Sequence, residues 1–190
     1  MKRQSKRELK KRSKKEPEGY DSYPAWIVLA TNLVSFATYG IGFYLLFLVG
    51  IFWGLLYVLY LFVLELLLYR DGCAYCYYYN KVCAFGRGKV AAIFFKKGNP
   101  KKFYEKELTM KKMIPHFLVL VFPLVGGLFI LFQSFSFFIL VLMAIPPFLW
   151  LFGNPITYGK LACAYCRQRE INCPASEFFM NKQSRSKNKK

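Results

Sequence analysis

Two long apolar runs dominate the pattern of hydrophobic and polar positions along this chain. The first extends from Pro24 to Tyr69 with one formal charge, Glu65, and the second extends from Met113 to Gly153 with none. A helix needs roughly 20 apolar residues to cross a bilayer, and each run is about twice that length. Helices satisfy their own backbone hydrogen bonds in lipid. The pattern therefore predicts an all-α membrane protein with four transmembrane helices, arranged as two helical hairpins.

Each hairpin must turn within its run. We expect the first turn near residues 38–42, although positions as far as Gly50 also satisfy the length, and the second turn near residues 133–136. Glu65 lies about one helical turn before the expected end of its helix. We therefore expect it to reach the interface or to pair with Arg70. His116, at the start of the third span, is expected to be interfacial.

Charge is segregated from the apolar runs. Lys and Arg outnumber Asp and Glu by 28 to 10, and nine of the 28 lie in residues 1–23, eleven in 70–112 and eight in 154–190. The two predicted turns carry no charge. Positively charged segments beside membrane helices stay in the cytoplasm. We therefore expect an integral multi-pass protein with its N-terminus, C-terminus and middle segment on the cytoplasmic side.

The two halves of the chain read as copies of one unit. The tetrad Cys-Ala-Tyr-Cys occurs at residues 73–76 and again at 163–166, and in both copies a third cysteine follows seven positions later. Two spans per copy give both copies the same orientation, so a pseudo-two-fold axis along the membrane normal can bring the motifs face to face. The predicted units are a basic tail (1–23), a first repeat (24–83), a basic loop (84–113), a second repeat (114–173) and a basic tail (174–190).

All six cysteines belong to these two C-x2-C-x6-C motifs. A reducing cytoplasm disfavours disulfides, whereas C-x2-C spacing lets two thiolates hold one tetrahedral ion at ~2.3 Å. Each motif offers three of the four ligands that a closed zinc site needs, so we expect the motifs to share metal. The predicted ligands are Cys73, Cys76, Cys83, Cys163, Cys166 and Cys173.

The paired motifs resemble the binuclear zinc cluster of fungal transcription factors. The resemblance implies that six cysteines hold two zinc ions, with Cys73 and Cys163 bridging both. The resemblance is confined to the two motifs. They are separated by 79 residues that contain two predicted spans. Three tyrosines at residues 77–79 stand where that family is basic. The cluster stoichiometry is therefore implied, and the DNA-binding role is not.

Other cysteine chemistries also fit the spacing. An iron–sulfur cluster needs a fourth ligand beside each trio, and Cys173 followed by Pro174 resembles the end of ferredoxin motifs. A C-x2-C pair can also act as a redox dithiol. Cys73 lies close enough to the predicted bilayer for acylation. Zinc is the first expectation, and iron–sulfur the second.

The middle segment contains a short apolar stretch, residues 90–95, between basic residues. We expect it to lie on the membrane surface with its lysines toward the headgroups. The Gly-Arg-Gly-Lys sequence at 86–89 lacks the preceding strand and the glycine spacing of a phosphate-binding loop. The chain also offers no Ser/His/Asp set and no paired catalytic carboxylates, which disfavours hydrolytic or transfer catalysis.

These patterns predict a structural or electron-carrying component of a membrane complex. The alternatives are a membrane thiol–disulfide oxidoreductase and a non-catalytic, bilayer-shaping hairpin protein. The expected partners are the lipid bilayer, anionic headgroups bound by the basic tails, and other membrane proteins. Nucleic acid is not an expected partner, because no aromatic residue interrupts residues 1–19 to stack on bases.

Overall fold

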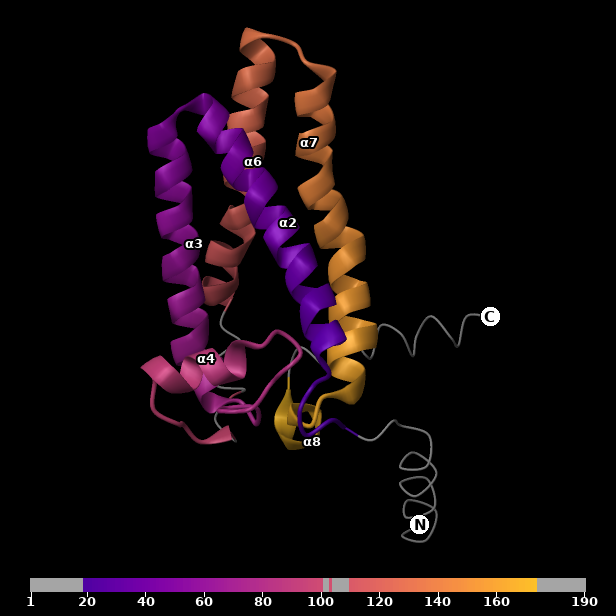
Figure 1. Ribbon diagram of the computed structural model, residues 1–190. Coiled ribbons are helices and arrows are strands. Elements are labelled where there is room, and N and C mark those ends of the chain that lie inside the picture. The colour runs from indigo at the N-terminus through magenta and orange to yellow at the C-terminus, as the bar shows by residue number, and fades with distance from the viewer. Residues whose placement is uncertain (1–18, 101–102, 104–109, 174–190) are drawn as a thin grey trace, which may run out of the picture.

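The computed structural model describes residues 19–100, 103 and 110–173. Four of its helices are long and apolar enough to cross a membrane. This confirms the predicted multi-pass membrane class. Figure 1 shows them as two upright helical hairpins that lie side by side. The candidate spans are Ala25–Val49, Ile51–Tyr75, Ile114–Gln133 and Phe137–Tyr165.

The connections lie at opposite ends of this bundle. Figure 1 shows the turns from α2 to α3 and from α6 to α7 at one end, and α4 and α8 at the other, which we call the cysteine end. The α-helices whose bounds fall within the described residues are α2 (Ala25–Val49), α3 (Ile51–Asp71), α4 (Arg87–Phe94), α6 (Met110–Gln133), α7 (Phe137–Phe148) and α8 (Gln168–Asn172). After α7 the span continues as two π-helical segments, Leu149–Gly153 and Pro155–Ala162.

The first hairpin turns at Gly50, at the far limit of the predicted interval and not at residues 38–42. Helix α2 runs through Gly42, which is buried where helices cross. A Cβ atom at Gly42 would lie 2.5 Å from the hydroxyl of Tyr57 and 2.9 Å from Pro123. Gly42 therefore permits close helix packing, as small residues do in membranes, and does not form a turn. The second turn was predicted correctly, because α6 ends at Gln133 and α7 begins at Phe137.

Tyrosines of α3 join the two hairpins. Pro123 lies inside α6 and has no N–H, so the carbonyl of Val119 loses its partner within the helix. The Tyr57 hydroxyl donates a hydrogen bond to this carbonyl at 3.0 Å. The Tyr60 hydroxyl likewise donates to the carbonyl of Pro115 at 2.6 Å. A polar group that α6 would otherwise leave unsatisfied thus becomes an interhelical contact.

The positions of the turns lead to a labelling experiment. Ser134 is exposed in the second turn, at the end opposite the six native cysteines. If the basic segments are cytoplasmic, a Ser134→Cys variant will react with a membrane-impermeant maleimide added outside intact cells. The native cysteines will react only after permeabilisation. Labelling of Ser134→Cys that also requires permeabilisation would overturn the predicted orientation.

Candidate cysteine site

The two Cys-Ala-Tyr-Cys tetrads have the same local structure. Each forms a 3₁₀-helical turn directly after a membrane helix, at Cys73–Tyr75 and at Cys163–Tyr165. The backbone N–H of the second cysteine donates to the carbonyl of the first, at 3.2 Å in one tetrad and 3.3 Å in the other. None of the six cysteines, all of which lie within the described residues, forms a disulfide. Each tetrad therefore places its two cysteines at the ends of a tight backbone turn.

The two motifs contact each other directly. The backbone N–H of Tyr77 donates to the Oε1 atom of Gln168 at 2.6 Å. The backbone N–H of Arg167 donates to the Tyr78 hydroxyl oxygen at 3.1 Å. The side chain of Gln168 is almost fully buried at this contact. Residues that follow each tetrad thus hold together two segments about 90 positions apart in the chain.

The segment that precedes α2 also binds the second motif. The backbone N–H of Tyr20 donates to the carbonyl of Tyr165 at 2.9 Å, and the two rings stack with centroids 4.8 Å apart. The Arg167 side chain donates to the carbonyl of Gly19 at 3.0 Å and pairs with Asp21 at 3.1 Å. The start of the first half is therefore tied to the end of the second.

Buried tyrosines form the core of the cysteine end. Tyr23 and Tyr78 pack edge to face with ring centroids 5.4 Å apart. The Tyr78 hydroxyl donates to the carbonyl of Tyr20 at 2.6 Å, and the Tyr23 hydroxyl donates to the carbonyl of Ala162 at 2.5 Å. Burial raises the pKa of Tyr78 to about 12, so its hydroxyl stays protonated as a donor. Our sequence reasoning missed these roles, although the tyrosine run at 77–79 marked the place. Three cysteines, Cys76, Cys83 and Cys166, pack against this core.

Burial favours the protonated, uncharged thiol at Cys76 and at Cys166. Burial raises the pKa of Cys76 well above its usual value, a backbone hydrogen bond from Tyr78 opposes this, and charge on Cys166, Cys83 and Cys73 raises it further. Burial also raises the pKa of Cys166, and charge on Cys83 raises it further. Cys166 of the second motif therefore packs against the same buried core as Cys76 and Cys83 of the first. Redox-active dithiols show the opposite shift, a lowered pKa.

The predicted metal ligands are only partly brought together. Cys163 and Cys173 are buried, and the other four cysteines are half-buried. Within the described residues, which include all six cysteines, no three His, Cys, Asp or Glu side chains are arranged so that they could hold a metal ion. His116 is exposed on α6. The metal set, including the bridging pair implied by the fungal resemblance, stays a prediction.

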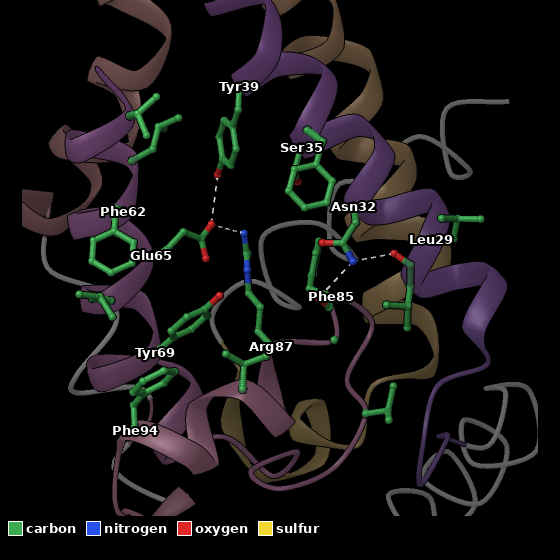
Figure 2. A pocket seen from close by; sticks show the side chains of 18 of the residues that line it. Leu29, Asn32, Ser35, Tyr39, Phe62, Glu65, Tyr69, Phe85, Arg87 and Phe94 are labelled. Carbon is green, nitrogen blue, oxygen red and sulfur yellow. Dashed lines mark hydrogen bonds and ion pairs between the residues drawn. The ribbon is translucent and has the colours of Figure 1, made fainter. Parts of the chain in front are cut away.

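A second polar cluster, formed by Glu65, Arg87 and Tyr39, lies inside the first hairpin. The partner of Glu65 differs from the predicted Arg70. Arg70 pairs with its neighbour Asp71 at 3.1 Å. Glu65 instead accepts hydrogen bonds on Oε1 from Arg87 at 2.5 Å and from the Tyr39 hydroxyl at 3.3 Å (Figure 2). Arg87 is the first residue of α4, which follows the cysteine loop and lies at the lower end of α3 in Figure 1. Tertiary folding therefore supplies a partner 22 positions away, which the spacing along one helix did not indicate.

Two glycines determine how α4 is placed after the cysteine loop. Gly86 has φ +71°, a left-handed conformation that glycine adopts without strain, and it precedes Arg87. Gly88 packs against the backbone of the cysteine loop, where an added Cβ atom would lie 2.1 Å from the carbonyl oxygen of Tyr78 and 2.5 Å from that of Lys81. The backbone N–H of Asn80 donates to the carbonyl of Gly88 at 3.0 Å. The Gly-Arg-Gly sequence thus positions α4.

Comparison with known proteins gives no match among protein-family models, curated proteins or solved structures. The fold defines the class, a helical multi-pass membrane protein. The proposals below rest on the geometry of this chain.

Proposed function

We propose that the two cysteine motifs together bind a thiophilic metal, zinc ions first and an iron–sulfur cluster second, at the cytoplasmic face of the membrane. The protein would act as a structural or electron-carrying component of a membrane complex. The observation that carries the proposal is the direct contact between the motifs through Tyr77, Tyr78, Arg167 and Gln168. Without this contact, each motif would have to complete its own site with a ligand other than cysteine.

Ligand number favours a shared site. Each motif has three thiols, and a closed zinc site takes four ligands. Cys76, Cys83 and Cys166 already pack on one core and repel one another when charged, and a bound cation would relieve that repulsion. Their side chains would have to rotate to bring the sulfurs to ~2.3 Å from the ion. Binding would release the thiol protons, so affinity should fall as the pH falls.

A buried hydrogen-bond donor beside the motif also fits this proposal. Within the described residues, the Nε2 atom of Gln168 is buried and has no hydrogen-bond partner. It belongs to the side chain whose Oε1 atom accepts from the first motif. An amide N–H next to a metal-bound thiolate can stabilise that thiolate and fix its orientation. The raised pKa of Cys76 and Cys166 disfavours dithiol redox chemistry, which needs a thiolate, and it also means that a metal must displace these protons to bind.

Metal analysis of the anaerobically purified full chain tests this proposal. We expect bound zinc without visible absorption, or brown protein with iron and acid-labile sulfide. A Cys166→Ser variant should lose most of the metal. Ala164→Ser, which adds an oxygen within the same turn without removing a thiol, should retain it.

Two results would contradict the proposal. One is a wild-type protein that takes up neither metal during expression nor zinc or iron and sulfide in reconstitution, with all six thiols freely titratable. The other is equal metal content in Cys166→Ser and Ala164→Ser. A mixed disulfide trapped by Cys76→Ser would favour the dithiol alternative instead.

A further inference from the structure

A large cavity opens in the side of the first hairpin. It has a volume of about 1010 Å³ and lies between α2 and α3, above α4 (Figure 2). This is at the upper end of the size range of small-molecule sites. Much of its lining is apolar, and several of the lining side chains are exposed, among them Leu29 (72%), Phe36 (67%), Phe62 (60%) and Phe94 (64%). Because α2 and α3 are candidate membrane spans, the part of the cavity between them lies at membrane depth. We call it the lateral cavity.

One end of the lateral cavity is polar and incompletely satisfied. Arg87 and Tyr39 both donate to the Oε1 atom of Glu65. The Oε2 atom is buried, and no hydrogen bond reaches it from the described residues. Figure 2 shows the Tyr69 hydroxyl pointing toward the carboxylate from below. A buried acceptor without a donor costs free energy, so this oxygen can accept a hydrogen bond from the nearby Tyr69 hydroxyl or from a ligand that enters the cavity.

The charge and depth of the site limit the ligand. Glu65 and Arg87 neutralise each other. Glu65 lies six residues before Asp71, the last residue of α3, which places it ~9 Å inside that end of the helix. A charged headgroup at this depth would be costly in the apolar part of a bilayer. A phosphate would also meet the carboxylate, and a ligand with acceptors alone, such as a quinone, would leave Oε2 unsatisfied.

We propose that the lateral cavity binds an uncharged membrane lipid that carries a hydroxyl group. Its O–H group donates a hydrogen bond to Oε2 of Glu65, and its hydrocarbon chain lies among the apolar side chains of α2 and α3. The lipid hydroxyl supplies a donor to this oxygen, which has none among the described residues, without adding charge to the neutral ion pair. This inference does not rest on metal binding by the cysteines, so either proposal can fail alone.

Three probes that each have one hydrocarbon chain, and that differ in their polar group, test whether a hydroxyl donor is required. Oleyl alcohol has the donor, oleyl methyl ether lacks it, and oleic acid adds a charge. Native mass spectrometry of the full chain in detergent measures how much of each probe is retained. We expect the ether to bind roughly tenfold or more weakly than the alcohol, because a hydrogen bond to a charged acceptor is lost. Equal binding of alcohol and ether, as for ordinary lipid solvation, or tightest binding of oleic acid, would overturn the proposal.

A pair of variants locates the site. Ser35 lines the lateral cavity, and its hydroxyl donates to the carbonyl of Thr31 within α2, so Ser35→Phe fills the cavity while sparing the ion pair. Gly40→Phe makes a similar change on the same helix, where an added Cβ atom meets nothing within 4 Å. Oleyl alcohol should be lost from Ser35→Phe and retained by Gly40→Phe. Equal retention of oleyl alcohol by the two variants would show that it does not bind in the lateral cavity. The alcohol and ether comparison on the wild-type protein decides the proposal even if Ser35→Phe does not fold.

Discussion

Replacement of Arg87 by methionine is expected to lower the free energy of unfolding by about 3–5 kcal/mol, because it leaves a buried carboxylate without its charge partner. The Arg87 and Glu65 side chains are only 15% and 23% exposed, and apolar residues surround them. Thermal or denaturant unfolding of the full chain in lipid nanodiscs measures the loss. The effect should be large because the cost of the unpaired charge exceeds the net value of the pair.

Two further variants separate this effect from a general loss of an arginine. Arg70 lies one residue before the end of α3, is 62% exposed and pairs with the adjacent Asp71. Arg70→Met should therefore change stability by no more than about 0.5 kcal/mol. Adding Glu65→Gln to Arg87→Met removes the unpaired charge and should recover most of the loss. A loss for Arg87→Met no larger than for Arg70→Met would contradict the burial of the pair.

Gly88→Ala is expected to destabilise the cysteine end by about 1–3 kcal/mol, because it overpacks a contact that cannot relax easily. The added Cβ atom would meet two backbone carbonyl oxygens, those of Tyr78 and Lys81, at 2.1 and 2.5 Å. Backbone atoms cannot rotate away as a flexible side chain can, so α4 must move. That movement would weaken the hydrogen bond from the Asn80 N–H to the Gly88 carbonyl. It would also weaken the hydrogen bond that the Tyr78 hydroxyl oxygen accepts from the Arg167 N–H of the second motif.

Thiol accessibility should report the same change. In metal-free protein, Cys76 and Cys166 are expected to react faster with a maleimide in Gly88→Ala than in wild type, since both pack against the core that contains Tyr78. Gly40→Ala is the matched control, because a Cβ atom there meets nothing within 4 Å. Unchanged stability and alkylation in Gly88→Ala, relative to Gly40→Ala, would show that α4 does not pack as closely as described.

Adjacent residues of α4 connect the two polar regions of the protein. Gly88 packs against the loop between Cys76 and Cys83, and Arg87 reaches the lateral cavity. In the sequence, this Gly-Arg-Gly stretch resembles part of a phosphate-binding loop but lacks its glycine spacing. Neither glycine conformation nor close backbone contact is visible from composition, so the role of the stretch became clear only when its neighbours were known.

Several features could be predicted from the sequence because local properties determine them. Apolar length alone predicts the four membrane helices, since a bilayer requires a minimum hydrophobic stretch whatever the tertiary packing. The polar break at Ser134 and Ser136 located the second turn within the longest uncharged run. The tight C-x2-C turns also follow from spacing, because a few residues fix their own backbone geometry.

Other features depend on contacts between distant segments, and only the tertiary structure decided them. Gly42 continues a helix because α3 and α6 pack against it, although a glycine by itself is also compatible with a turn. Glu65 pairs with Arg87 rather than Arg70, since Gly86 turns α4 back beneath the hairpin. The contact from Tyr77 to Gln168 spans 91 positions. A one-dimensional pattern carries no record of which buried polar groups satisfy one another across such distances, because that choice is made by packing.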